Sequence, residues 1–435
     1  MTFTICVFAA TVVAMICSVI FKPYVKIGKV KIGLYYVITV IGAGLLLISG
    51  ELPFDFAVEK ITAKTAVNPL KILALFISVS LISLYLKNAG FFDYVAEKIF
   101  SKTKNGGYKL FIALYLSAAI LTTFTSNDIV ILTFTPPICI FCKKAKVSPV
   151  PYLFGEFVAA NTWSMALIIG NPTNVYLAES TGISFFNYLK VMIFPTVVSG
   201  AISFLLLLLI FKKSLKSNEG AYIEGDGGES VRPNRFLTAL SLIHLFGCLV
   251  FLAVAEFIGA ESYLVCVISA ASLTLFYSLY CTVKEKSIKR IVKVFSGAPY
   301  ELIPFVLSMF IIVSSLSYCG FTEKLSSLLL TANKTDAISF GFLSAVASNF
   351  LNNIPMSVLF ERIVAGNSAA ALFGSVIGSN VGAFITPVGA LAGIMWNKIL
   401  SDYGVKFPFW KFFVFGILIA IPALAAATLS LLITL

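Results

Sequence analysis

The chain alternates between long apolar stretches and short polar connections from one end to the other. Six apolar stretches fall at residues 2–21, 33–50, 70–87, 110–142, 148–178 and 187–211. Six more fall at 236–256, 262–282, 298–318, 337–360, 368–399 and 409–433. A helix needs about 20 predominantly apolar residues to cross a membrane. The pattern therefore predicts an all-α polytopic membrane protein.

The two series of stretches flank a polar linker at residues 214–235. Six stretches, a linker and six more stretches indicate a duplicated unit. We therefore predict one repeat at residues 1–213 and a second repeat at residues 236–435.

The fourth stretch has an unusual length. It holds 33 residues between Lys109 and Lys143, too many for one crossing and few for two. Because both ends are basic, we predict a re-entrant hairpin at about 110–142, with its counterpart at about 337–360. About ten transmembrane helices then accompany two hairpins and two unwound helices, at 148–178 and 368–399.

Lys and Arg are enriched on the cytoplasmic side of membrane proteins. With both hairpins in place, 25 of the 32 Lys and Arg residues fall on one side of the predicted topology. This predicts external N- and C-termini, a cytoplasmic linker at 214–235 and repeats of inverted topology, in the inner membrane of a prokaryotic cell. The basic segment 284–293 is either an interfacial amphipathic helix or a solvated loop.

Composition narrows the class of protein. The chain is 59% hydrophobic and 12% charged, with a mean hydropathy of +0.97. Its net charge of +12 lies in short loops, which indicates membrane orientation and no nucleic-acid partner. One histidine and eight scattered cysteines make neither a metal cluster nor a disulfide framework. We expect no enzyme activity and no cofactor, so energy comes from an H⁺ or Na⁺ gradient or from a soluble ATPase partner.

Short polar interruptions divide both predicted hairpins and both segments that follow them. Unwound backbone at membrane depth is tolerated only where protein or a water-filled cavity satisfies it, and paired breaks indicate a transporter's binding site. The candidate residues for a small-molecule or ion substrate are Thr125, Ser126, Asn127, Asp128, Gly170, Asn171, Thr173, Asn174, Asn349, Asn352, Asn353, Ser379, Asn380, Thr386 and Gly389. The alternative for the small polar residues is hydrogen bonding between helices.

Two carboxylates are candidates for proton coupling. Asp128 either binds a proton or cation at the hairpin tip, or caps a half-helix that begins at Ile129. Glu156 either carries a proton or reaches the cytoplasmic interface. The C-x-x-C pair Cys139 and Cys142 lies on a predicted hairpin arm, which favours packing.

At these residues the chain resembles the arsenical pump membrane protein (ArsB) family. The resemblance rests on Ser126-Asn127-Asp128, Asn352-Asn353-Ile354-Pro355 and the stretch from Ile385 to Trp396. The wider superfamily includes NhaD-type sodium/proton antiporters and divalent-anion/sodium symporters. The resemblance implies inverted repeats, a homodimer in the lipid bilayer and elevator-like movement of the hairpins.

The leading hypothesis is proton-coupled efflux of arsenite, antimonite or a similar small solute. A sodium/proton antiporter would use the same carboxylate, Asp128. A sodium-coupled organic-anion or sulfate symporter is disfavoured because Asp128 would repel an anion. A channel or a scaffold protein would not need two pairs of broken helices.

Overall fold

The structure is a computed structural model, and it describes residues 1–435 except 23, 28–29, 64–67, 104–105, 221–231, 256, 332 and 365–367. Residues 221–231 of the predicted linker therefore lie outside the described residues. Helices dominate the described part, which confirms the prediction of an all-α polytopic membrane protein. The sequence did not predict its antiparallel ribbon, in which β1 (Tyr24–Ile27) pairs with β2 (Val30–Gly33).

The first half of the chain contains the elements before residue 218. They are α1 (Thr2–Phe21), α2 (Leu34–Ile48), α3 (Phe54–Thr62), α4 (Pro69–Asn88), α5 (Phe91–Lys102), α6 (Gly107–Phe124), α7 (Asn127–Ala145), α8 (Val150–Trp163), η1 (Ser164–Ala166), η2 (Ile168–Gly170), α9 (Pro172–Ser180) and α10 (Phe185–Ser217).

The second half of the chain follows a similar order. It contains α11 (Arg235–Ala255), α12 (Ser262–Tyr280), η3 (Cys281–Glu285), α13 (Lys289–Ser296), α14 (Leu302–Tyr318), α15 (Phe321–Leu329), α16 (Asp336–Leu351), α17 (Asn353–Val364), α18 (Ala369–Val381), η4 (Gly382–Phe384), α19 (Leu391–Asp402) and α20 (Phe409–Thr434).

The same turn precedes the fifth helix of each half. Gly90 and Gly320 stand directly before α5 and α15, with φ of +89° and +76°. Glycine adopts this left-handed backbone at little cost. A phenylalanine follows each of them, Phe91 and Phe321. This local similarity fits the order of helices that the two halves share.

Several helices are long and apolar enough to cross a bilayer. Within the described residues there are six of them, and the bent pair α14 and α15 raises the number to seven. Their outer surfaces carry large apolar side chains, such as Leu209, which is 69% exposed, and Ile243, which is 68% exposed. Soluble proteins rarely leave such surfaces uncovered, so lipid covers them here. The chain is an integral membrane protein.

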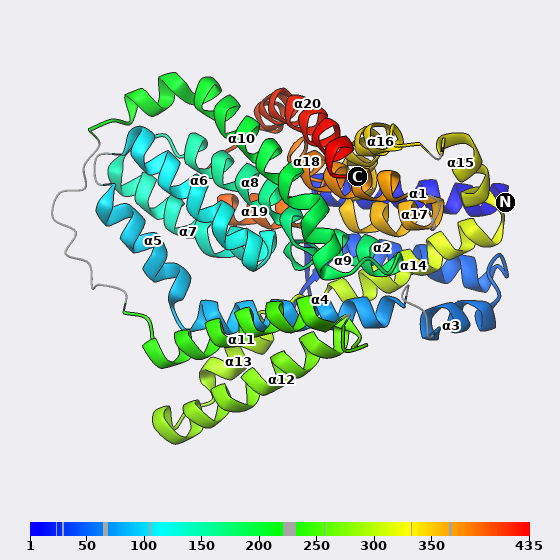
Figure 1. The fold of residues 1–435 in the computed structure, drawn as a ribbon, viewed down its shortest axis with the longest axis horizontal. Coiled ribbons are helices and arrows are strands. Elements are labelled where there is room, and N and C mark those ends of the chain that lie inside the picture. The colour runs from blue at the N-terminus through cyan, green and yellow to red at the C-terminus, as the bar shows by residue number, and fades with distance from the viewer. Residues whose placement is uncertain are drawn as a thin grey trace.

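The helices form two layers. We call α1–α4 and α11–α14 the scaffold layer, because α4 packs against α11 and α12 while α2 packs against α1 and α14. We call α6–α10 and α16–α20 the hairpin layer, in which α6 packs on α8, α16 on α18 and α10 on α20. In Figure 1 α10 and α20 lie along the top of the view and α11 to α13 along the bottom.

Helices α6 and α7 form a hairpin whose two ends meet. The backbone N–H of Gly107, at the start of α6, donates to the Tyr152 hydroxyl at 2.9 Å. The Asn218 amide donates to the Tyr152 hydroxyl at 3.3 Å and to the Ser148 carbonyl at 3.2 Å. Since Ser148 follows α7 closely, the chain returns to the level at which α6 began. The predicted stretch 110–142 is therefore two helices joined at a break.

Candidate functional site

The tip of the first hairpin is a break of two residues. Helix α6 ends at Phe124 and α7 begins at Asn127, and Ser126 between them is extended. The Ser126 hydroxyl accepts the Ile129 N–H at 3.4 Å and so caps α7. The alternative reading of Asp128 as the cap is therefore wrong, because the helix starts one residue before it.

Asp128 lies in the first turn of α7. Its backbone N–H donates to the Asn127 side-chain oxygen at 2.9 Å. Its carboxylate has no hydrogen bond or ion pair with any residue in the described part of the chain. The positive end of the helix dipole favours a negative charge at this position. The carboxylate therefore lies at the hairpin tip without a cation partner among the described residues.

Asp128 lines a cavity of about 410 Å³ between the two layers. Ligand pockets commonly measure about 300–1,000 Å³. The hairpin layer contributes Ser126, Asp128, Ile129, Leu132, Leu391, Ile394, Met395, Lys398, Ile399 and Asp402 to the wall. The scaffold side contributes Tyr24, Tyr35, Ser80, Leu84 and residues 297–299, 301 and 302.

The charged groups of the cavity are unequal in number. Asp128, Glu301 and Asp402 are acidic, and Lys398 is the one basic residue among the described residues of the wall. The Tyr35 hydroxyl donates to Glu301 at 2.7 Å, and the Lys398 ammonium lies 4.6 Å from the centre of the Tyr24 ring. With the carboxylates ionised, the described residues of the wall carry a net negative charge.

The first unwound segment joins α8 to α9. Two short 3₁₀ turns precede an extended Asn171, whose side chain accepts the Thr173 N–H at 3.2 Å and caps α9. Gly170 leaves no room for a side chain, because a Cβ there would lie 2.1 Å from the Ser164 carbonyl oxygen. The predicted break at Gly170-Asn171 therefore coincides with the observed one.

The second broken helix consists of α18, the unwound segment 382–390 and α19. Asn380, near the end of α18, connects this helix to the first broken helix, which consists of α8, the unwound segment and α9. Its side-chain oxygen accepts from the Ser164 hydroxyl at 2.7 Å and from the Asn171 amide at 2.9 Å. Its amide donates to the Asn174 side-chain oxygen at 2.7 Å. All four residues are fully buried. We call them the Asn380 network.

A second contact joins the same two broken helices. The hydroxyls of Thr173 and Ser379 lie 3.3 Å apart and are also buried. The sequence therefore predicted five of the residues that meet here, and it missed Ser164. The only signal for Ser164 was a polar residue placed three positions after Asn161 in an apolar stretch.

The second hairpin breaks at Asn352, between α16 and α17. Its φ of +73° lies in the left-handed region, which asparagine enters more readily than most residues. Asn349 ties this tip to the second unwound segment, because its oxygen accepts from the Thr386 N–H at 2.9 Å and hydroxyl at 2.7 Å. A Cβ at Gly389 would lie 2.9 Å from the same oxygen. The candidates Asn349, Thr386 and Gly389 therefore form one contact.

Two buried oxygens at this tip have no donor among the described residues. They belong to the side chains of Asn352 and Asn353. The amide of Asn353 donates to the Asn171 oxygen at 3.5 Å, and that of Asn352 donates to the Val388 carbonyl at 3.0 Å. Buried acceptors are normally hydrogen-bonded. These oxygens are therefore available to a hydroxyl or a cation.

Of the remaining candidates, Asn127 begins α7 and contacts the first broken helix. Its amide donates to Asn161 of α8 at 3.1 Å. Thr125 donates its hydroxyl to the Leu121 carbonyl at 2.7 Å and does not line the cavity. The structure thus brings Ser126 and Asp128 to the cavity. The other candidates do not line it; Asn349 and Thr386 are half-buried and the rest are buried.

Glu156 lies inside the hairpin layer. It is fully buried, and the Thr135 hydroxyl of α7 lies within 3.2 Å of both its carboxyl oxygens. The alternative reading, in which Glu156 reaches the cytoplasmic interface, is therefore wrong. Cys139 and Cys142 are buried and unpaired, as the packing interpretation predicted.

Broken helices, paired hairpins and a cavity with charged side chains between two helical layers define a membrane protein of the secondary-transporter class. The family model described as citrate transporter (CitMHS) matches residues 30–372. Because that match spans most of the sequence, the chain belongs to the CitMHS family. It is a secondary transporter and not an enzyme.

Individual relatives confirm the resemblance to arsenical pump membrane proteins. The "Arsenical pump membrane protein" of Escherichia coli K12 is 29% identical over 367 residues, covering 81% of this chain and 83% of that protein. The "Putative arsenical pump membrane protein" of Bacillus subtilis 168 is 25% identical over 378 residues, covering 80% and 84%. The Alcanivorax borkumensis YdaH transporter aligns with a TM-score of 0.57 at 13% identity, covering 99% and 97%, and shows similarity of fold alone.

Proposed function

We propose that this transporter exports a small uncharged solute, arsenite or antimonite, in exchange for protons that bind to Asp128. The observation that carries the proposal is the Asp128 carboxylate, which lines the cavity at a hairpin tip without a cation partner in the described residues. A carboxylate in such a place is usually functional, and its surroundings determine how readily it binds or releases a proton.

The charge of the cavity argues against an anionic substrate. Citrate, which the family's description names, carries several negative charges near neutral pH. The described residues of the wall offer one ammonium group, on Lys398, and three carboxyl groups. Like charges held about 4–6 Å apart destabilise one another by an amount that grows as water is excluded. A neutral solute avoids this repulsion.

Arsenite suits the buried polar groups as well. Near pH 7 it is a neutral trihydroxide, which presents hydroxyl donors and no charge. The side-chain oxygens of Asn352 and Asn353 are buried acceptors that lack donors among the described residues. A solute hydroxyl that reached this tip would satisfy them. We therefore place solute binding between the second hairpin tip and Asn171.

Transport requires the site to open first to one side of the membrane and then to the other. The cavity separates the hairpin layer from the scaffold layer, so movement of one layer along the other would carry Asp128 between faces. This is the elevator mechanism that the resemblance implies. Protonation would neutralise Asp128 for one half of the cycle, and release of the proton would reset it.

Orientation and assembly are part of the same proposal. Lys71, near the start of α4, forms an ion pair with Glu261, directly before α12, so these two ends share one face. Arg290 and Asn234 both contact the opposite end of α4, at Asn88 and Ala89. We propose that the face at Asn88 and Ala89 is cytoplasmic in a prokaryotic inner membrane, and that the N- and C-termini lie outside. A homodimer and a soluble ATPase partner remain predictions.

Transport into everted membrane vesicles tests the proposal. We expect arsenite uptake driven by a proton gradient, and we expect Asp128→Asn to abolish it. Asp93→Asn is the matched control, because Asp93 is an exposed carboxylate on α5. The sodium/proton antiporter alternative predicts instead that sodium collapses the gradient and that arsenite is not taken up. Normal arsenite uptake by Asp128→Asn would refute the role of Asp128.

A further inference from the structure

The short helix α13 presents three different faces. Val294 is 1% exposed and packs against the scaffold layer. Ile288, directly before the helix, Val292 and Phe295 follow one another at intervals of four and three residues and remain 58%, 58% and 37% exposed. Residues at such intervals share one face of a helix. The helix therefore has an apolar face that the described part of the chain leaves exposed.

A basic face lies beside the apolar one. Lys289 and Lys293 are four residues apart and exposed, and Lys284 and Lys286 in the preceding turn are exposed as well. Acidic side chains do not balance them, because Glu285 forms its ion pair with Arg290 at 2.9 Å. An apolar face bordered by lysines is typical of a helix that lies in the membrane interface.

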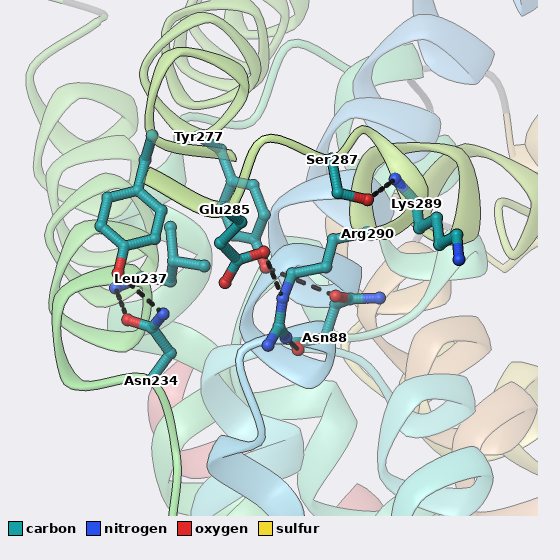
Figure 2. Close-up of polar contacts among 9 residues, drawn as sticks. Asn88, Asn234, Leu237, Tyr277, Glu285, Ser287, Lys289 and Arg290 are labelled. Carbon is teal, nitrogen blue, oxygen red and sulfur yellow. Dashed lines mark hydrogen bonds and ion pairs between the residues drawn. The ribbon is translucent and has the colours of Figure 1, made fainter. Parts of the chain in front are cut away.

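Figure 2 shows how α13 is fixed in place. The Arg290 guanidinium reaches inward and donates to the Asn88 carbonyl, at the end of α4, and to Glu285, both at 2.9 Å. The Lys289 side chain points away from this cluster. Arg290 therefore fixes α13 to the end of α4. The four lysines form no ion pair with a described residue, so they can bind a ligand.

The position of α13 places it at a membrane surface. Three spans end around it, because Asn88 closes α4, Tyr280 closes α12 and Asn234 stands directly before α11. Asn234 donates its amide to the Tyr280 hydroxyl at 3.1 Å and its backbone N–H to the Ala89 carbonyl at 3.0 Å. The ends of the spans therefore share one level, and α13 lies at that level.

The corresponding helix of the first half has the opposite charge. Helix α3 also leaves apolar side chains exposed, Phe54 at 67% and Val58 at 41%. It carries Asp55 and Glu59 against one lysine, Lys60, whereas α13 carries three basic residues and no acid. The shared fold tolerates either sign of charge, so the basic face of α13 needs another explanation.

We propose that α13 and the turn before it bind the phosphate headgroups of anionic phospholipids, with the exposed apolar face against the acyl chains. Lysines near a membrane surface attract anionic headgroups, and their contributions accumulate. The site lies far in sequence from Asp128 and does not depend on which solute is transported.

Binding of phosphatidylglycerol to the purified full-length protein tests this proposal by native mass spectrometry. The variant replaces Lys284, Lys286, Lys289 and Lys293 by Gln, and we expect its affinity for phosphatidylglycerol to fall by about tenfold or more. Binding of phosphatidylcholine, which has no net charge, should not change. The matched control replaces the exposed or half-buried lysines of the opposite face, Lys60, Lys190, Lys324 and Lys334, by Gln.

The outcomes separate the proposal from its alternatives. An equal loss of phosphatidylglycerol binding in both fourfold variants would overturn it, because the effect would then reflect total charge. Excess inorganic phosphate should not displace the bound lipid. If phosphate alone competes fully, the site binds a free anion and the lipid proposal is wrong. Gel filtration of both variants checks that they fold.

Discussion

Replacement of Asn380 by Ala should weaken the contact between the two broken helices. The change removes three hydrogen bonds to the first broken helix, to Ser164, Asn171 and Asn174, each between 2.7 and 2.9 Å. It also removes the bonds that the amide donates within α18, to the Val376 carbonyl at 2.8 Å and the Ser379 hydroxyl at 3.4 Å. Hydrogen bonds between membrane helices contribute about 0.6 kcal/mol on average, and a buried group left without a partner costs about 1–3 kcal/mol. The variant should therefore lose between about 2 and 6 kcal/mol of stability.

Thermal unfolding with a thiol-reactive fluorophore measures this loss. Cys139, Cys142, Cys248, Cys266 and Cys281 are buried and free, so they react only as the protein unfolds. The unfolding midpoint of Asn380→Ala should fall by about 2–7 °C. Asn187→Ala is the control, because Asn187 is exposed and its side chain makes no hydrogen bond within the described part.

A double variant adds a sharper criterion. If Asn171 and Asn380 act through their mutual hydrogen bond, the loss in the double Ala variant should be smaller than the sum of the single losses. Additive losses, or an Asn380→Ala midpoint equal to that of the native chain, would refute the coupling of the two broken helices.

Three further predictions concern packing, the cavity and orientation. Gly170→Ala should prevent folding, because its Cβ would lie 2.1 Å from the Ser164 carbonyl oxygen. Gly247→Ala is the control, because a Cβ there meets nothing within 4 Å, and gel filtration compares the two variants. Tyr35→Phe removes the hydrogen bond to Glu301 and should cost about 0.5–1.5 kcal/mol of stability, against no cost for the exposed Tyr318→Phe, in the same thermal assay. An amine reagent that cannot cross membranes should label Lys190 and Lys324 in intact cells but Lys289 only in everted vesicles, and the reverse pattern would contradict the proposed orientation.

The apolar stretches and their interruptions were predictable, because each depends on local composition. All twelve predicted stretches correspond to observed helices or to helix pairs. The breaks at Ser126 and Asn352 follow from polar residues in apolar surroundings. The choice of Ser126 over Asp128 as the cap was not predictable, since Ser, Asn and Asp cap helices about equally well and stand in succession here.

Contacts between distant segments could not be predicted in this way. The partners of Asn380 depend on how two broken helices are placed against each other, and Glu301 enters the cavity only through the packing of the two layers. The ribbon of β1 and β2 did leave a local signal. Val25 and Ile27 alternate with Lys26, and alternation with a period of two favours a strand.

The central claim, that Asp128 couples protons to solute movement, is tested most directly by comparing two transport modes of one variant. In proteoliposomes, exchange of labelled arsenite at equal concentrations on both sides needs solute binding and no net proton transfer. Uptake driven by a proton gradient needs both solute binding and net proton transfer. We predict that Asp128→Asn retains exchange and loses gradient-driven uptake. Gradient-driven uptake at the native rate in Asp128→Asn would contradict the account.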